Sequence, residues 1–562
     1  MRKTAISAED RTVSPADYTV QLSNLPHHVT DEEIKEWIEN LSTDVQQIQC
    51  RKINRAYHIV DFEIYETKKN ELHKRLYKEM DHTNKLILEQ ELEQLEREEN
   101  IRVQSQEQKY TDVAYVTLAN AKMADYLCRS FKMNSVGKAV YRINPWIDQK
   151  NKLKGEKIKI VRAPEPSDIL WGNLGYSTFE KFKYRAITIF VSTLVLVIGF
   201  VLIFLVYDAQ KIAKKNVKEN SAKITLFSIA GSILICIINS LLTWTIRRLA
   251  GSEKRGTQTS YSTAIAKKQA IASLFNTSFT TILVEIIMSE GFSLTSNFLT
   301  GLDTVNIYGK GGIIENMFTT FIISALYSPI FNLIDLSYIW KKCQQDKVLE
   351  GDDIPDMTQA EANALFEGPK PNMSLKYSVL LKTMLLTSFY APAMPICLPI
   401  TILGLIFLYW TDKYLLLRRN CLPPSLGSRL NASMIEYLEW MAFTFAMGNL
   451  LFMFTLIDTE GDRAYNRTHQ IIVWVTLVIS LVSIVFPMER LNRTWFPIQD
   501  EVTENETYDQ AKQHFTNDYD LQNPITHLQT VLDLAHTNEP NNYQIHESQR
   551  LLRSRPPKHF DD

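Results

Sequence analysis

The sequence predicts a polytopic α-helical membrane protein whose N-terminal part is an α+β domain carrying a helical insertion. Three observations support this fold class. Residues 186–487 hold a series of apolar segments close to the roughly 20 residues that a membrane-spanning helix needs. Residues 18–170 instead alternate short β-type runs with amphipathic helical runs. The hydrophobic share of 45% is therefore concentrated in the middle of the chain, between two polar ends.

Composition and motifs exclude several classes of function. A net charge of −2 over 562 residues gives no global attraction to nucleic acid. The six cysteines include no CxxC pair, so neither a zinc site nor a disulfide framework is indicated. The chain also lacks a phosphate-binding loop, a GxSxG or HExxH motif and a dinucleotide-binding fingerprint. We therefore expect no enzymatic activity, no cofactor and no bound metal.

After a polar lead-in at residues 1–17, an α+β domain is predicted over residues 18–170. Residues 18–26 form a strand that ends in a turn, and Thr30 with Glu33 forms a capping box that begins a helix. The further elements are a second strand within 48–64, a helical insertion near 67–106, a third strand at 112–118, a second helix at 120–131 and a fourth strand at 157–161. This order is the ferredoxin-like split βαβ pattern, and it resembles an RNA-recognition motif (RRM).

The RRM-like pattern does not predict RNA binding in this chain. RNA-binding members of that fold stack bases on aromatic side chains of the two central strands. Here the aromatic position of the first strand holds Gln21, and on the third strand only Tyr115 is suitably placed. We expect no nucleic-acid partner, and a regulatory or assembly role for this domain.

Hydropathy predicts about eight transmembrane helices. They are Ala186–Tyr207, Ile224–Thr245, Ala270–Ser289, Gly312–Leu336, Tyr377–Met394, Pro395–Trp410, Tyr437–Ile457 and Ile471–Pro487. They divide into a channel-type transmembrane region at 184–457 and an outer loop with the last helix at 458–488. A polar cytosolic tail follows at 489–562, which we expect to be disordered or peripheral because it is rich in Asn and Gln.

The distribution of Lys and Arg predicts the orientation. An even number of spans leaves both ends of the region on one side of the membrane. Basic residues gather on that side, at 181–185, 247–268 and 413–429, which makes it cytosolic by the positive-inside rule, although the lysine-rich loop at 208–223 disagrees. The expected localisation is integral to the plasma membrane, with both termini in the cytosol.

Polar side chains inside the predicted spans are the candidate functional residues. Such groups are costly at membrane depth and usually face a bundle interior or a water-filled path. They recur at helical spacing on four spans, and the pore-lining candidates are Ser232, Asn239, Thr277, Thr281, Glu285, Glu315, Asn316, Thr320, Ser324, Tyr327, Asp335, Lys382 and Thr387. Two interpretations remain open: a polar seam that joins the helices, or a conduit in which the acidic residues favour cations.

The chain also resembles the hyperosmolality-gated, calcium-permeable channel family (OSCA/CSC type), which is related to the anoctamins. The resemblance is carried by YTVQLSNLP (Tyr18–Pro26), APEPSDILWGNL (Ala163–Leu174) and MTQAEANALFEGP (Met357–Pro369). It implies a mechanically or osmotically gated cation channel that passes Ca²⁺, K⁺ and Na⁺ through a pore inside each subunit. It also implies contact with membrane lipids and a homodimer formed through the cytosolic domain.

The same resemblance sharpens two expectations about the spans. Within the pore wall it implies, Pro329 removes a backbone hydrogen bond and predicts a kink or break, so Pro329, Gly311 and Gly312 are gating hinge candidates. Residues 377–410 contain no acidic residue, so the intramembrane calcium site of calcium-activated anoctamins is not expected.

The chain departs from the family pattern in one respect. Relatives have three further transmembrane helices before the cytosolic domain, so this sequence is expected to be a truncated product or a shorter variant. Two other functions stay open: a lipid scramblase that uses the same polar groove, and a non-conducting membrane scaffold.

Overall fold

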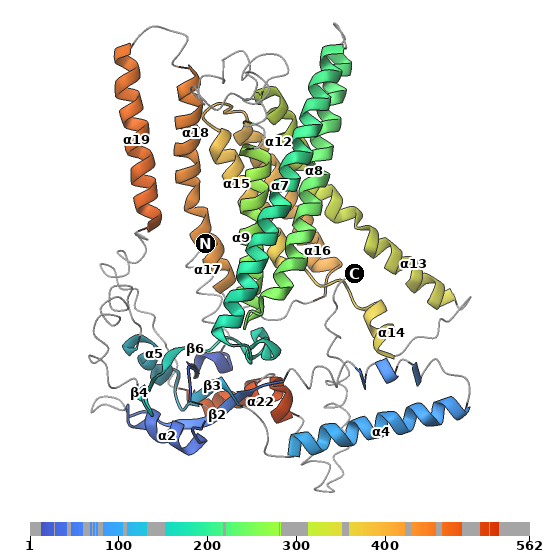
Figure 1. Cartoon of the computed structure of the whole chain (residues 1–562), viewed down its shortest axis with the longest axis vertical. Helices are drawn as coiled ribbons and strands as arrows, with labels where there is room; N and C mark the ends of the chain where they lie inside the picture. Colours follow the sequence, from blue (N-terminus) through green and yellow to red (C-terminus); the bar gives the residue numbers. More distant parts are fainter. Residues whose placement is uncertain are drawn as a thin grey trace.

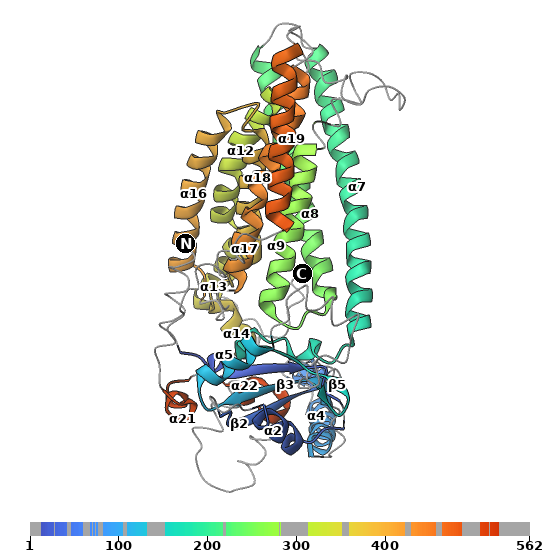
Figure 2. The same cartoon turned by 90° about the vertical axis from the view of Figure 1, so that its left-hand side faces the viewer.

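The computed structural model describes residues 13–26, 28–41, 47–59, 68–69, 71–73, 75–76, 82–104, 110–131, 152–216, 221–279, 282, 313–350, 359–421, 429–456, 463–485, 506–515 and 518–527. A bundle of long helices stands on a smaller α+β domain, and the two views at right angles show the same division (Figure 1, Figure 2). The N-terminal α+β domain and the apolar helices agree with the predicted fold class.

A four-stranded antiparallel sheet forms the centre of the N-terminal domain. Its strands are β1 (Thr19–Ser23), β2 (Cys50–Tyr57), β3 (Tyr110–Leu118) and β6 (Lys159–Arg162), in the order β2-β3-β1-β6. Val20 lies opposite Val116, and Leu22 lies opposite Ala114. A separate two-stranded hairpin joins β4 (Lys152–Leu153) to β5 (Glu156–Lys157). All four predicted strands are present, with bounds shifted by a few residues.

One face of the sheet is covered by the helices α2 (Asp31–Glu39) and α5 (Ala121–Ser130). The predicted capping box begins α2: the Thr30 hydroxyl accepts a hydrogen bond from the Glu33 nitrogen, and the Glu33 carboxylate accepts one from the Thr30 nitrogen. Alternate residues of the strands point to this side and pack with the apolar sides of the helices, as Leu22, Ile34 and Leu127 do. This core holds the domain together.

The opposite face is covered by residues from distant parts of the chain. Trp171 from the segment after β6 packs there, together with Tyr519 and Ile525 from the C-terminal tail. The tail forms α21 (Tyr508–Ala511), the 3-10 turn η7 (Lys512–His514) and α22 (Tyr519–Gln522). The sequence predicts a largely disordered or peripheral tail, and disorder does not hold for these residues, which are folded onto the N-terminal domain. Polar composition does not reveal this docking, because a few aromatic and aliphatic side chains suffice to anchor the segment.

The predicted helical insertion lies between β2 and β3. Its main element is the helix α4 (His82–Gln104), which extends along the lower edge of the molecule (Figure 1). Lys69, from the preceding short helical stretch, forms an ion pair with Glu96 of α4 at 3.0 Å. This contact joins the two arms of the insertion as a helical hairpin would.

The bundle is built from helices that pack in neighbouring pairs. Its elements are α7 (Thr178–Asn216), α8 (Ser221–Ala250), α9 (Gln258–Leu274), the π-helical η6 (Phe275–Phe279), α12 (Ile313–Ile334), α13 (Leu336–Glu350), α14 (Gln359–Phe366), α15 (Met373–Tyr390), α16 (Cys397–Arg418), α17 (Arg429–Leu438), α18 (Trp440–Leu456) and α19 (Arg463–Val485). Helix α12 packs on α8 and α16, and α15 packs on α9 and α18. Their shared core contains Met317, Phe321, Phe389 and Phe452.

Four helical segments of the described chain are long and apolar enough to cross a membrane: Thr178–Val206, Ile229–Glu253, Ile313–Leu349 and Cys397–Arg418. They overlap the first, second, fourth and sixth predicted spans. The other predicted spans are helical in α9, α15, α18 and α19, but their described residues do not reach the same length and apolarity. Large apolar side chains such as Phe190, Trp244 and Phe407 are exposed on the outer surface, as expected for contact with lipid.

Glycine permits two close helix contacts in the bundle. A Cβ atom at Gly404 of α16 would lie 2.7 Å from the Cβ atom of Ala325 on α12. A Cβ atom at Gly448 of α18 would lie 2.0 Å from the backbone oxygen of Phe389 on α15. Small residues at such crossings let helix backbones approach closely, and the van der Waals contacts formed there contribute to helix association in a membrane.

Pro329 lies inside α12, and the helix continues past it to Ile334. The helix therefore does not break at Pro329, whereas the kink and the gating hinge proposed for Pro329 stay predictions. The break comes six residues later at Asp335, after which α13 leaves the bundle at an angle (Figure 1). A proline removes one hydrogen bond, whereas Asp335 provides a new N-cap, because its Oδ1 accepts a hydrogen bond from the Ser337 nitrogen at 3.1 Å.

Candidate functional site: a polar helix seam and its link to the N-terminal domain

Hydrogen bonds between helices join polar groups of the bundle, most of them side chains. The hydroxyls of Ser232 on α8 and Thr320 on α12 lie 3.3 Å apart, and the Asn239 amide donates to the Thr277 hydroxyl of η6 at 3.1 Å. The other three join Ser240 to Tyr327 at 3.1 Å, Thr387 to Thr401 at 2.7 Å, and the Tyr390 hydroxyl to the Ser278 carbonyl at 3.3 Å. Together they form what we call the polar seam. Helix α8 is thus bonded to α12 and to η6, η6 is bonded to α15, and α15 is bonded to α16.

The centre of the polar seam is a π-helical turn. Asn276, Thr277 and Ser278 follow one another on η6 and are all at least 98% buried. A Cβ atom at Gly199 of α7 would lie 2.9 Å from the Asn276 amide nitrogen, so the glycine leaves room for that side chain. A π-turn widens the backbone locally and is frequent at functional sites. Here it brings three successive polar side chains into the bundle interior.

Three buried polar atoms at this turn have no hydrogen-bond partner among the described residues. They are the Asn239 Oδ1, the Asn276 Nδ2 and the Ser278 Oγ. A buried polar atom without a partner costs about 1–3 kcal/mol, so such a cluster favours water or a small polar solute between the helices. All three side chains are uncharged, and two of the atoms are oxygens, which are the ligands that hydrated cations prefer.

The remaining predicted pore residues have varied surroundings. Glu315 and Asn316 are partly buried in the first turns of α12, where their carbonyls accept hydrogen bonds from Thr319 and Thr320. Ser324 and Lys382 are partly buried on α12 and α15. Thr281, Glu285, Gly311 and Gly312 lie outside the described residues.

Asp335 has a cationic partner. Its Oδ2 lies 3.1 Å from Nη2 of Arg419, at the end of α16. Arg419 also donates to the Leu333 carbonyl at 2.9 Å, which satisfies one of the carbonyls left open at the end of α12. Its guanidinium stacks on the Tyr338 ring, 3.7 Å from the centroid. The carboxylate and arginine therefore fix the elbow between α12 and α13.

The bundle is joined to the N-terminal domain by the segment that follows β6. Asp168 Oδ1 accepts hydrogen bonds from the nitrogen and the hydroxyl of Thr259, in the first turn of α9. The Leu170 nitrogen donates a hydrogen bond to the Gly256 carbonyl at 2.9 Å, and the Asn173 side-chain amide donates one to the Arg255 carbonyl at 2.8 Å. We call this junction the latch. The negative charge of Asp168 also lies at the N-terminus of α9, where the helix dipole favours it.

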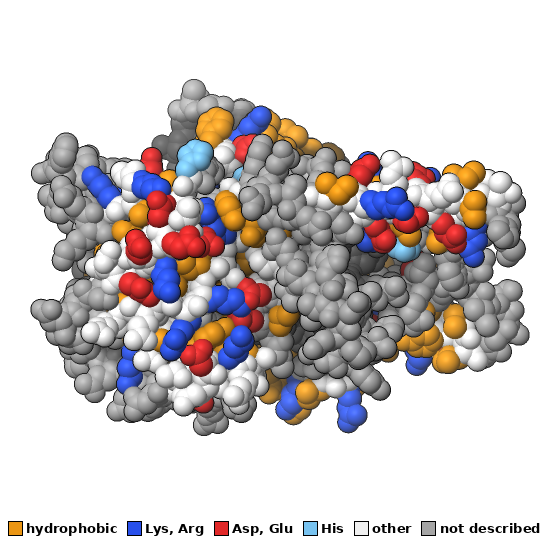
Figure 3. All heavy atoms as spheres, turned by 90° about the horizontal axis from the view of Figure 1, so that it is seen from below, with side chains coloured by type: hydrophobic (Ala, Val, Ile, Leu, Met, Phe, Trp, Pro, Cys, Tyr) orange, Lys and Arg blue, Asp and Glu red, His pale blue; other side chains and the backbone are white. Residues whose placement is uncertain are grey.

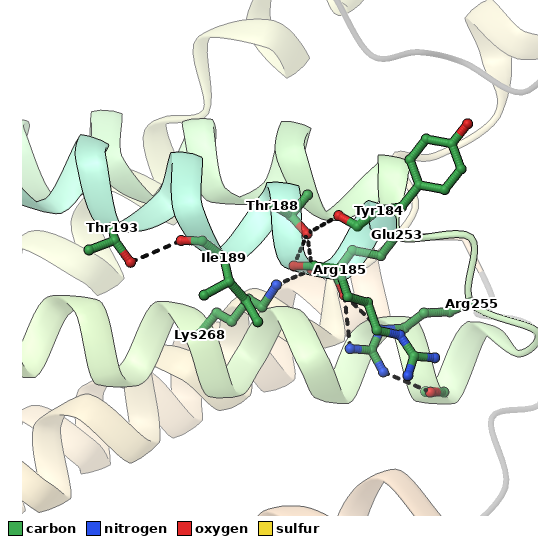
Figure 4. A network of polar contacts seen from close by, with 9 residues as sticks. Tyr184, Arg185, Thr188, Ile189, Thr193, Glu253, Arg255 and Lys268 are labelled. Atoms are coloured by element: carbon green, nitrogen blue, oxygen red, sulfur yellow. Dashed lines mark hydrogen bonds and ion pairs between the residues drawn. The ribbon is translucent and has the colours of Figure 1, made fainter. Parts of the chain in front are cut away.

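Next to the latch lies a buried carboxylate, shown in Figure 4. Glu253, in the 3-10 turn η5 (Gly251–Glu253), is fully buried, and its side chain forms ion pairs with Lys268 of α9 and Arg255. The Thr188 hydroxyl of α7 donates to Glu253 at 3.1 Å. One carboxylate thus joins α7 and α9 to the loop between α8 and α9. Removing one partner of such a buried group is strongly destabilising.

Several of these residues were not identified as candidates from the sequence. Asp168 belongs to the quoted APEPSDILWGNL run, and its contact with α9 comes from tertiary structure. Glu253 and Arg419 lie in the basic loops that predict the orientation. The positive-inside rule uses only the number of basic residues and does not identify their ion-pair partners. Asn276 gave a usable signal, because an amide in an apolar run needs a buried partner.

The comparisons with known proteins support the family for the N-terminal part of the chain. Residues 17–173 match the family model described as "Cytosolic domain of 10TM putative phosphate transporter". That family model represents the cytosolic domain of OSCA/CSC proteins, so the match supports that resemblance and a membrane protein of transporter or channel type. The matched range ends at Asn173, within the latch. No curated protein matches the chain significantly.

Proposed function

We propose that this chain is a subunit of a mechanically or osmotically gated, calcium-permeable cation channel, with the conducting path along the polar seam. The observation that carries the proposal is the cluster of buried atoms of Asn239, Asn276 and Ser278 around the π-turn that have no hydrogen-bond partner among the described residues. A dry seam would leave these atoms without a partner among the described residues, at a cost of about 1–3 kcal/mol each. A hydrated path would instead supply their partners from water and permeating ions.

The choice of a cation rests on the chemistry of the seam. Its central side chains are neutral and offer hydroxyl and carbonyl oxygens, which replace the water around a cation. The phosphate named in the family description is an anion, and its recognition would need Arg, Lys or helix N-termini directed at it. The polar seam contains no such group among its described members.

The latch supplies the physical basis for mechanical gating. Force or swelling that moves the N-terminal domain is transmitted through Asp168 to the first turn of α9. Helix α9 has 17 residues, about 26 Å at 1.5 Å per residue, and it leads directly into the π-turn. Movement at one end of this helix therefore reaches the polar cluster at the other.

The proposal extends to the cellular arrangement of the chain. The N-terminal domain is an RRM-like assembly domain, supported by the strand order β2-β3-β1-β6, and it forms a homodimer in the cytosol. The tail at 506–527 packs on the same domain, so both lie on the cytosolic side of about eight spans in the plasma membrane. The permeating ions are Ca²⁺, K⁺ and Na⁺, and lipids contact the exposed apolar surface.

Patch-clamp recording from liposomes containing the purified chain tests this function. We expect suction to open cation currents, and Asn239→Leu with Ser278→Ala to reduce the unitary conductance. Thr193→Ala, on the exposed side of α7, is the matched control and should conduct normally. Silence under suction, from protein that is folded by circular dichroism, would exclude a channel and favour the scaffold.

A lipid scramblase is the second candidate. Ser240 is exposed to the outside of the bundle and its hydroxyl pairs with the half-buried Tyr327, so part of the polar seam reaches the lipid-facing surface. If polar groups continue from this pair to the surface, headgroups could move along them, as the relation to the anoctamins implies. Bleaching of fluorescent lipids by dithionite distinguishes the two functions, because a channel without scramblase activity leaves the inner leaflet protected.

A further inference from the structure

The face of the sheet opposite α2 and α5 is covered by residues 518–527. Figure 1 and Figure 2 both place α22 against β2 and β3. Tyr519 is fully buried there, and its ring stacks on that of Tyr115 with 5.1 Å between centroids and 21° between planes. Its hydroxyl donates to the Pro164 carbonyl at 2.7 Å, just before the latch. This one side chain therefore makes both apolar and polar contacts with the domain.

Further contacts extend along the tail on both sides of Tyr519. The Asn523 amide donates to the Arg55 carbonyl of β2 at 2.9 Å, and Ile525 is fully buried. Upstream, the Tyr508 backbone nitrogen donates a hydrogen bond to the Ala119 carbonyl at 2.9 Å. The rings of Tyr508 and Phe515 pack against Tyr18. The segment thus binds by backbone hydrogen bonds, aromatic packing and an amide anchor.

Charge is complementary across the contact. Lys52 on β2 forms an ion pair with Asp520 and lies 3.6 Å from Asp518 Oδ2, and Arg51 pairs with Asp509 at 3.2 Å. The tail supplies the three carboxylates and the strand supplies the two cations. Elsewhere on the lower surface, acidic and basic side chains are interspersed over its described part (Figure 3). The match at β2 is therefore local to this contact.

We propose that this sheet face is a binding site for an acidic peptide with a central tyrosine, and that residues 506–527 of this chain are its built-in ligand. In RRM-like domains the same face is the one that stacks bases. Here Tyr115 is 1% exposed beneath Tyr519, so the aromatic platform recognises a protein segment. The proposal does not depend on the channel function, because it concerns binding alone.

Cleavage of the full-length protein tests the site directly. A protease sequence inserted within residues 490–505 separates the tail from the last helix without altering the contact. After cleavage in detergent, we expect the fragment that contains residues 506–527 to stay with the body of the protein in size-exclusion chromatography. Immediate and complete release of the wild-type fragment would overturn the proposal, because the contact would then depend on the covalent connection.

Substitutions decide whether the named side chains carry the binding. Tyr519→Ala should speed release at least roughly 30-fold, the effect of losing an interface hot spot. Asp518→Asn with Asp520→Asn should make release less sensitive to salt. Leu521→Ala, at an exposed neighbouring position, is the matched control and should release like wild type. Equal release rates for Tyr519→Ala and Leu521→Ala would also overturn the proposal.

A synthetic peptide of residues 506–527 supplies a second measurement on the cleaved protein. We expect it to displace the bound fragment, and the same peptide with Tyr519→Ala to fail at equal concentration. If both peptides displace it equally, the site does not recognise the tyrosine. If neither does so while the fragment exchanges freely, the face is not a peptide site.

Discussion

One oxygen of Asp168 accepts two hydrogen bonds from Thr259, from the backbone nitrogen at 2.7 Å and from the hydroxyl at 2.9 Å. Both residues are buried, and they come from different parts of the molecule. The N-terminal domain therefore contributes a cap to a helix of the bundle. A cap from another domain ties the stability of the helix to the position of that domain.

Asp168→Ala should lower stability by about 1–3 kcal/mol, because both donors of Thr259 lose their acceptor while remaining buried. Thermal unfolding in detergent measures this loss. Thr259→Ser keeps both bonds and should behave like wild type, whereas Thr259→Val keeps only the backbone bond and should be intermediate. An unchanged melting temperature for Asp168→Ala would show that the latch contributes nothing to stability.

A double-mutant cycle on the polar seam separates real coupling from proximity. Ser232→Ala and Thr320→Val should each destabilise the bundle, and the double variant should lose about 0.6 kcal/mol less than the sum, the typical coupling of a hydrogen bond in a membrane. Ser232→Ala with Thr387→Val is the control pair, since Thr387 bonds to Thr401 instead. Strict additivity for Ser232 and Thr320 would mean that their hydroxyls do not interact.

Asp335→Asn should leave the ratio of cation to anion permeability unchanged. Asp335 lies 3.1 Å from Arg419, so its charge is already compensated and adds little to the field felt by a passing ion. The same variant should alter the pressure needed for opening, because it loosens the elbow between α12 and α13. Reversal potentials in asymmetric KCl measure the ratio, and a clear loss of cation selectivity would place Asp335 on the conducting path.

The sequence predicted local features well and tertiary pairings poorly. The capping box at Thr30 and Glu33 depends on residues three apart, so it could be identified before the fold was known. The rows of polar side chains along the helices could be predicted for the same reason, because helical spacing alone places Ser232 and Asn239 on one side of their helix. The pairing between helices could not be predicted, because the bonded residues are far apart in the sequence: Thr320 lies 88 residues from its partner Ser232. The partner of Asp335 and the docking of Tyr519 depend in the same way on distant residues.

Alkaline pH should release the tail. Burial raises the pKa of the Tyr519 phenol well above its ordinary value of about 10. The neutral, docked phenol therefore contributes stability that is complete below about pH 10 and is lost as the pH rises above it, because only the released phenol ionises readily. Burial also raises the pKa of Tyr115 and Tyr508, which act in the same direction.

The cleaved protein provides the measurement for this pH effect. Fragment release followed from pH 8 to pH 11 should accelerate above about pH 10, and Tyr519→Phe should weaken that dependence while releasing faster at pH 8, since it lacks the bond to Pro164. Circular dichroism at each pH checks that the body of the protein stays folded. Identical pH profiles for wild type and Tyr519→Phe would contradict the prediction.

Gly448→Ala should destabilise the bundle by about 1–3 kcal/mol, the usual cost of overpacking. The new methyl group would lie 2.0 Å from the Phe389 carbonyl oxygen, so α15 and α18 would have to move apart. Gly251→Ala is the matched control, because a Cβ atom there has no neighbour within 4 Å. Thermal unfolding of the two variants compares them, and equal midpoints would mean that the crossing tolerates a wider spacing.

The docking of the tail also has a consequence for biosynthesis. Tyr519 follows Pro164 by 355 residues, and the whole helix bundle is encoded between them. At about 5–20 residues per second, a ribosome needs roughly 20–70 s to cover that distance. During that interval Tyr115 and Trp171 have no tail to cover them, so the nascent domain presents an aromatic surface while its membrane helices are still being inserted. Residues 506–527, which are translated after the whole bundle, therefore complete a domain that emerges before the bundle.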